Sequence, residues 1–169
     1  KEVNLEVYSD FDAKSYILNE NEGYEYIIEN IESLDASKLG DYEILYKSHN
    51  SVHSKEATLV VHVVDSTPPE ITLTKDFLVL VRGDETKKFK AKEYLKSIED
   101  NYSPKEKLEI NFTKNINFDN DEVEGIYTAK DEVGNTATNI LNIAVVESEE
   151  GEEKKQEETT EEESTTEKE

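Results

Sequence analysis

The chain has 169 residues, of which 19 are Lys or Arg and 41 are Asp or Glu, so its formal net charge is −22. A charge of this sign repels phosphate backbones and anionic lipids, which argues against binding to nucleic acid or to a membrane surface. The sequence has no Cys, which excludes disulfides and thiolate sites, and no apolar run approaches the roughly 20 residues of a membrane-spanning helix.

The sequence divides into three parts. Pro68 and Pro69 interrupt both helix and central strand, and predict a short, stiff link between a first domain (1–66) and a second domain (67–147). Residues 148–169 are rich in Glu and hold no apolar side chain, so they are predicted to form a disordered acidic tail. A domain near 60 residues buries only about 60% of its unfolded surface. The first domain therefore either depends on its neighbour or lacks its opening strand.

Alternation of apolar and polar residues dominates both domains and predicts short β-strands separated by Asp, Asn, Gly and Ser turns. Such a pattern is typical of an all-β sandwich. One exception is the segment from Ala91 to Ile98, where apolar residues recur at helical spacing and predict one short helical segment in the second domain. The alternating segments begin at Val3, Tyr24, Tyr42 and Ala57 in the first domain, and at Ile71, Phe77, Leu108 and Leu141 in the second.

The two domains resemble each other in their closing halves. Gly40-Asp-Tyr42 and Gly125-Ile-Tyr127 each place a Gly two residues before a Tyr, and each precedes a long final strand. Gly permits a tight corner into a strand, and the Tyr hydroxyl can bond the backbone just upstream, as in the tyrosine corner of Greek-key sandwiches. We therefore predict structural roles for these four residues and for the Pro-Pro pair.

Two motifs carry a family resemblance. Asp65-Ser-Thr-Pro-Pro-Glu-Ile71, followed by Gly125-Ile-Tyr-Thr-Ala-Lys-Asp-Glu-Val-Gly-Asn-Thr-Ala137, resembles the bacterial immunoglobulin-like domains of the group-3 type. The first domain matches only in its closing half and lacks the Pro-Pro opening. The resemblance implies two tandem Ig-like Greek-key β-sandwiches in a secreted or cell-surface bacterial protein.

Catalysis is not expected. His49, His53 and His62 are the only histidines, and His62 lies within a Val-rich strand pattern. His49 and His53 flank a turn, so their spacing does not place both rings on one helix face. The sequence has no Gly-x-Ser-x-Gly motif and no phosphate-binding Gly loop. We therefore predict that the protein is not an enzyme.

The sequence requires no cofactor, and calcium is the one alternative that stays open. Asp and Asn commonly occur in turns because they bond the local backbone, which is the ordinary role for these acids. Clustered carboxylates also supply the hard oxygen ligands that Ca²⁺ prefers. The candidate ligands are Asp65, Glu70, Asp119, Asp121 and Asp131.

The expected function is that of a non-catalytic spacer, a monomer whose partners are neighbouring modules of the same polypeptide. The alternative is an adhesion module that binds an extracellular glycan or protein through its loops or a sheet face. Tyr102, in a loop beside Pro104, is the expected contact residue for that alternative. The chain starts at Lys1 and has no Met, which indicates a processed form or a piece of a longer protein.

Overall fold

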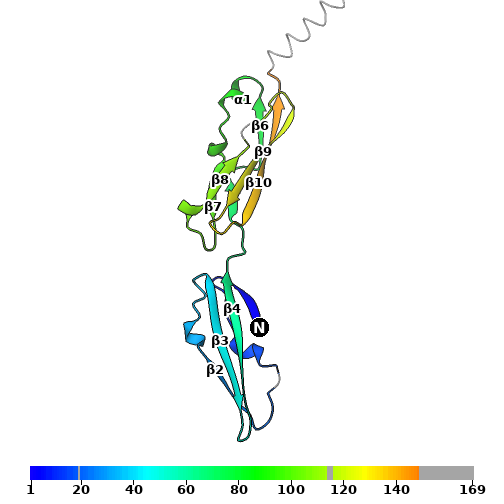
Figure 1. Ribbon diagram of the computed structural model, residues 1–169. Helices are drawn as coiled ribbons and strands as arrows, with labels where there is room; N and C mark the ends of the chain where they lie inside the picture. The colour runs from blue at the N-terminus through cyan, green and yellow to red at the C-terminus, as the bar shows by residue number, and fades with distance from the viewer. Residues whose placement is uncertain (19, 114–115, 149–169) are drawn as a thin grey trace, which may run out of the picture. The chain divides into compact units, whose positions relative to one another are not determined.

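The computed structural model describes residues 1–18, 20–113 and 116–148, which form two compact units divided between Thr67 and Pro68. The division falls at the Pro-Pro pair. Strands make up most of the regular structure in both units (Figure 1). The predicted acidic tail, residues 148–169, lies outside the described residues apart from Ser148. Within the described part of the chain, no helix is long and apolar enough to cross a membrane.

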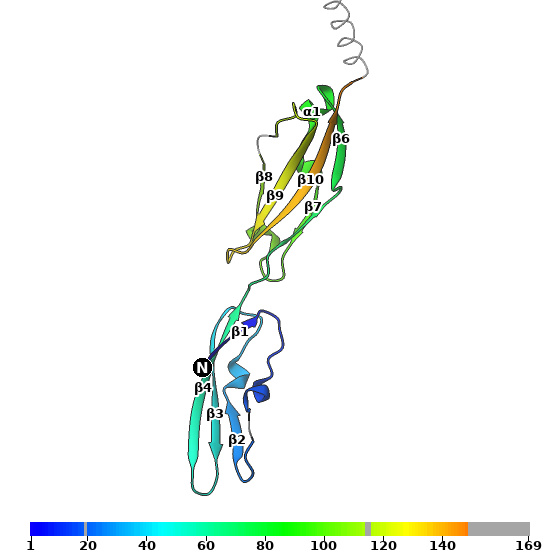
Figure 2. The same cartoon turned by 90° about the vertical axis from the view of Figure 1, so that its right-hand side faces the viewer.

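The first unit contains one four-stranded sheet in the order β1-β4-β3-β2. Its apolar face packs Ile44, Leu59 and Val61, which are almost completely buried. The layer opposite this face consists of turns, including 3-10 segments at Ala13–Tyr16 and Ile31–Ser33. Figure 2 shows the segment between β1 and β2 running along one side of the sheet. The strands are β1 Glu2–Glu6, β2 Glu25–Glu29, β3 Gly40–His49 and β4 Ser54–Val64.

The second unit has a four-stranded sheet, β6-β10-β9-β8, and a two-stranded sheet, β5-β7. The core between them contains Tyr127, Leu141 and Ile143 from the larger sheet and Ile71 and Ile98 from the smaller one. The elements are β5 Glu70–Leu73, β6 Phe77–Val81, α1 Asp84–Lys88, β7 Leu95–Glu99, β8 Glu109–Phe112, β9 Glu122–Lys130 and β10 Thr136–Val146.

The two four-stranded sheets share one topology. In each, the last strand of the unit (β4 or β10) pairs parallel with an early strand (β1 or β6) and antiparallel with the strand before it (β3 or β9). The internal repeat seen in the sequence is thus a repeat of strand order. The predicted all-β class is confirmed, since the described chain is mostly β. Two sheets pack against each other in the second unit, and one sheet packs against turns in the first.

The helical prediction for residues 91–98 is wrong. Ala91–Glu93 forms a single 3-10 turn, and β7 begins at Leu95. Tyr94 stacks on Phe89 with ring centroids 5.5 Å apart, and Ile98 enters the core from β7. The apolar spacing reflects this packing rather than a helix face. The only α-helix among the described residues is α1, which has five residues.

The Gly-x-Tyr motif has different roles in the two units. Gly40 opens β3 with a φ of +153°, and the Tyr42 hydroxyl donates to the Lys38 carbonyl at 3.1 Å, four residues upstream, as expected of a tyrosine corner. Gly125 instead lies inside β9, where an added Cβ would be 3.1 Å from Cε2 of Phe112. The Tyr127 hydroxyl donates to the Ala91 carbonyl at 2.7 Å. The corner prediction is therefore wrong for the second unit, where close packing explains the glycine.

Candidate functional site

The loop between β9 and β10 is organised around Asp131, which is only 3% exposed. Its Oδ1 accepts backbone N–H groups from Val133 at 3.0 Å, Gly134 at 2.6 Å and Asn135 at 2.8 Å. Its Oδ2 accepts from Nδ2 of Asn135 at 2.8 Å. Gly134 adopts a φ of +109°, which L side chains rarely tolerate. The Asp-x-x-Gly-Asn sequence thus forms a closed loop around one buried carboxylate.

A second carboxylate approaches Asp131 from the loop after β7. Oδ1 of Asp100 accepts the backbone N–H groups of Tyr102 at 3.0 Å and Ser103 at 2.6 Å. Oδ2 of Asp100 is buried and has no hydrogen-bond partner among the described residues. Carboxylate oxygens of Asp100 and Asp131 lie within 4.8 Å of one another. The backbone N–H of Glu132 donates to Oγ of Ser103 at 3.3 Å, which joins the two loops.

This pair of carboxylates has the chemistry of a cation site. Two like charges at close range in a partly buried setting repel each other unless a proton or a cation compensates them. A Ca²⁺ ion binds oxygens at about 2.3–2.6 Å, so one ion can contact two oxygens that are about 4.8 Å apart. Among the described residues of the second unit, Asp100 and Asp131 are therefore the side chains best placed to hold a divalent cation.

The other predicted calcium ligands have separate environments. Among the described residues, Glu70, Asp119 and Asp121 belong to no group of three metal-ligating side chains. Oδ1 of Asp121 instead pairs with Nη2 of Arg82 at 2.7 Å. In the first unit, Asp65 is 8% exposed and its Oδ1 accepts the Thr67 N–H at 3.2 Å.

Asp100 was missed by the sequence analysis because the signal for it was weak. Asp100-Asn-Tyr-Ser103 reads as an ordinary turn, and nothing local indicates that it faces another acid. Tyr102 in the same turn is partly buried, and its role as a contact residue stays a prediction. Tyr8 and Tyr16, at 59% and 41% exposed, are the more accessible tyrosines. In the adjacent Pro68-Pro69 pair, Pro69 is buried and Pro68 is exposed.

His62 connects three strands of the first unit. Its Nδ1 donates to Oδ1 of Asp41 on β3 at 2.6 Å, and its Nε2 lies 3.8 Å from Oε2 of Glu2 on β1. The hydrogen bond to the Asp41 carboxylate raises the pKa of His62 above its usual value. A histidine held in this way by two surface carboxylates has a structural explanation and needs no catalytic one.

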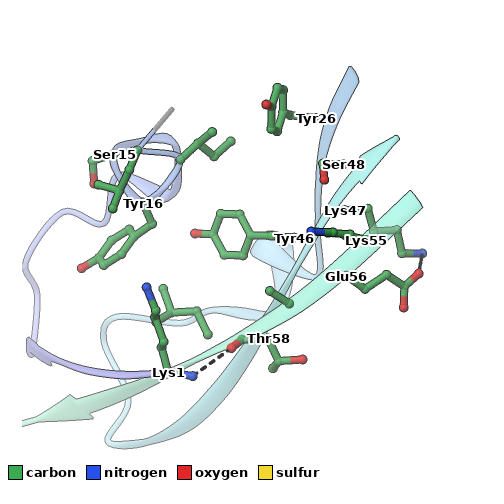
Figure 3. Close-up of a pocket in the computed structure, with 14 residues that line it drawn as sticks. Lys1, Ser15, Tyr16, Tyr26, Tyr46, Lys47, Ser48, Lys55, Glu56 and Thr58 are labelled. Atoms are coloured by element: carbon green, nitrogen blue, oxygen red, sulfur yellow. Dashed lines mark hydrogen bonds and ion pairs between the residues drawn. The ribbon is translucent and has the colours of Figure 1, made fainter. Parts of the chain in front are cut away.

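The first unit contains a cavity of about 670 Å³ on the same sheet face as its core. Three tyrosines line it, Tyr16 from the Ala13–Tyr16 turn, Tyr26 from β2 and Tyr46 from β3, and we call it the tyrosine groove (Figure 3). The Tyr46 hydroxyl donates to the Ala13 carbonyl at 2.9 Å, and the Tyr26 hydroxyl accepts the Asn21 N–H at 2.8 Å. The sequence analysis did not identify this cavity.

Comparisons with known proteins identify no family. No protein-family model and no curated protein matches the sequence. Protocadherin gamma B7 (domains EC3-6) aligns with 87% of this chain and 45% of that chain at 11% identity and a TM-score of 0.37. Human mucin-like protocadherin (EC1-2) aligns with 87% of this chain and 96% of that chain at 10% identity and a TM-score of 0.30. Likenesses at this level carry no argument about ancestry or activity. Membership of the bacterial group-3 type remains a prediction.

Proposed function

We propose that this chain is a non-catalytic structural module of a bacterial secreted or cell-surface protein, in which it holds other modules away from the envelope. In this role the chain is a monomer, and its partners are neighbouring modules of the same polypeptide. The supporting observation is the parallel pairing of an early strand with the last strand in each unit. β1 pairs with β4 from Glu2–Val60 to Glu6–Val64, and β6 pairs with β10 from Phe77–Asn142 to Val81–Val146.

Parallel pairing of this kind suits a part that carries tension. Because β1 and β4 run in the same direction, β1 starts at one end of the pair and β4 finishes at the other. A force applied along the strands then loads all of the inter-strand hydrogen bonds together, rather than breaking them one after another. The same geometry holds for β6 and β10. Each unit is therefore expected to resist stretching through its ends.

Stretching of single molecules through the two chain ends tests this role. The Val7 N–H donates to the Val64 carbonyl, and the Lys1 carbonyl accepts the Val60 N–H, both at 2.8 Å. Odd-numbered residues of β1 thus direct their backbone groups toward β4. Val3→Pro removes one of these bonds and is expected to lower the force of one of two unfolding events. Asn4→Pro, whose N–H points away from β4, is the matched control and should change that force much less.

The mechanical role would be contradicted if the wild-type chain extended without resolved unfolding events. Equal forces for the Val3→Pro and Asn4→Pro variants would also contradict it, because the β1–β4 bonds would then not carry the load.

A bound cation is the second part of the proposal. Ca²⁺ between Asp100 and Asp131 would supply a partner for the buried Oδ2 of Asp100 and join the loops that follow β7 and β9. Calcium at about 100 times its Kd would add about 2.7 kcal/mol to the stability of the second unit by mass action. Millimolar Ca²⁺ is thus expected to raise its melting temperature in calorimetry, and Asp100→Asn should abolish the rise. Asp119→Asn, an exposed acid, is the control. Identical melting in EDTA and in Ca²⁺ would refute the cation.

Adhesion is the second candidate function, and the tyrosine groove favours it. A cavity of about 670 Å³ lined by aromatic side chains is within the size range of ligand sites in proteins. Aromatic rings with a polar tip are also common in contact surfaces, because they combine apolar area with a hydrogen-bonding group. Adhesion and a mechanical role are compatible, since one chain can both bind a ligand and carry load.

A further inference from the structure

We propose that the tyrosine groove binds a short segment of a polysaccharide that carries spaced carboxylates, such as a polymer with one uronic acid in every second sugar. The inference rests on the extracellular setting of the proposed function and specifies the ligand class of the adhesion candidate. Three observations support it: an uncovered part of the core face, aromatic walls held in place, and two lysines without acidic partners.

The groove is a continuation of the core face beyond the turns that cover it. In the β3–β4 register, Ile44 lies opposite Leu59, and both are buried. Further along the same face, Tyr46 lies opposite Ala57, which is exposed. The small side chain of Ala57 leaves room above the sheet, and the hairpin extends past its cover. An apolar floor therefore remains open to a ligand.

The aromatic walls are held in place before any ligand arrives. Tyr16 stacks on Phe11 with ring centroids 5.5 Å apart, and the hydrogen bond to Ala13 fixes the Tyr46 ring. Figure 3 shows the Tyr46 hydroxyl pointing toward the turn that carries Ser15 and Tyr16, with Tyr26 lying apart from both rings. Rings that need no reordering offer contact area at a low entropic cost. The apolar face of a sugar ring fits such a surface.

The charges at the groove select an anion. Lys1 and Lys55 line the cavity, and among the described residues neither forms an ion pair. Among the described residues that line the cavity, Glu56 is the only acid, and its Oε1 lies 3.7 Å from Nζ of Lys47, whose strand position is on the other face of the sheet. Among its described residues, the lining thus holds three lysines, Lys1, Lys47 and Lys55, against one acid, although the chain as a whole has 41 acids and 19 basic residues. They form a local positive region in a negative field.

The hydroxyl groups of this floor suit a sugar. β3 and β4 pair with each other over ten residue pairs, whereas β1 pairs with β4 only from Val60 to Val64. An acidic peptide that adds a strand to β4 before Val60 is therefore the competing ligand in the test below. The Tyr46 hydroxyl already donates its proton to Ala13, so its oxygen can accept a hydrogen bond from a sugar hydroxyl. The net charge of −22 opposes a densely charged polymer, which is why spaced carboxylates are specified.

NMR titration of the full chain with a hyaluronan hexasaccharide at low salt tests the proposal. Saturable shifts are expected at groove residues, and they should weaken as salt rises. Lys55→Gln is expected to weaken binding about two- to fivefold, in the range of an exposed ion pair. Tyr16→Ala should weaken binding about two- to tenfold through lost aromatic contact. Lys75→Gln makes the same charge change at an exposed position of the second unit and should leave the affinity unchanged.

Three results would overturn the proposal. One is the absence of saturable shifts at millimolar hexasaccharide, and another is equal binding of neutral chitohexaose. The third is tighter binding of an acidic peptide at the same residues. Each of these leaves the mechanical function intact, because the stretching experiment needs no ligand. Conversely, a chain that binds the hexasaccharide but extends without unfolding events would keep the groove and lose the load-bearing role.

Discussion

Replacement of Asp131 with Ala is expected to lower the free energy of unfolding of the second unit by about 2–4 kcal/mol. The substitution removes the acceptor for three backbone N–H groups and for the Asn135 amide, at a site only 3% exposed. Val133 and Gly134 are themselves exposed, so water can satisfy part of what is lost. The loss is therefore expected to be smaller than the sum of four bonds to a charged group. Urea unfolding in EDTA, followed by NMR signals of the second unit, measures it.

Two further variants serve as comparisons for Asp131→Ala. Asp119→Ala changes an exposed acid and is expected to cost less than about 0.5 kcal/mol. Asp131→Asn keeps one oxygen for the backbone donors but places an amide where Oδ2 accepts from Asn135, so its cost should lie between the two. An Asp131→Ala variant within about 0.5 kcal/mol of wild type would show that the loop does not depend on its carboxylate.

Local patterns sufficed to predict much of the fold. Alternating residues such as those of β4 and β10 predict strands because one face of each is buried and the other is not. The positive φ of Gly40 and the bond from Tyr42 follow from residues close together in the sequence. Features of this kind depend on little beyond the chain's immediate neighbours.

Other features could not be predicted because they depend on contacts distant in the sequence. The Ala91–Ile98 spacing fits a helix, yet the Tyr94–Phe89 stack and the β5–β7 pairing give a turn and a strand. The approach of Asp100 to Asp131 depends on how β7 and β9 are placed by their sheets. The tyrosine groove depends on where the covering turns stop. An alternating sequence predicts a strand with one apolar face, but it does not show whether another part of the chain covers that face.

The one Arg of the sequence shows the same limit. Arg82 stands out in the sequence because it is the only Arg, but the sequence does not show which residues it contacts, since those residues are distant along the chain. Its Nε donates to Oε1 of Glu147 at 2.8 Å, its Nη2 donates to Oδ1 of Asp121 at 2.7 Å, and its Nη1 donates to the Phe118 carbonyl. Glu147 is 65 residues away along the chain. These contacts tie the end of β6 to the end of β10 and to the loop before β9.

Arg82→Lys is consequently expected to lower the free energy of unfolding of the second unit by about 1–2 kcal/mol, and Arg82→Ala by about 2–3 kcal/mol. The planar guanidinium reaches three acceptors in different directions from a side chain that is 23% exposed, whereas a lysine ammonium at one point cannot reach all three. Urea unfolding at low salt and at 1 M salt measures the loss, and Asp121→Asn, which removes one of the three acceptors, should cost less than Arg82→Ala. A lysine variant as stable as wild type would show that charge alone matters at this position.

Arg82 and Glu147 directly follow β6 and β10. Arg82→Ala should therefore also lower the force at which the second unit unfolds on stretching, because it weakens the end of the β6–β10 pair on which the load falls.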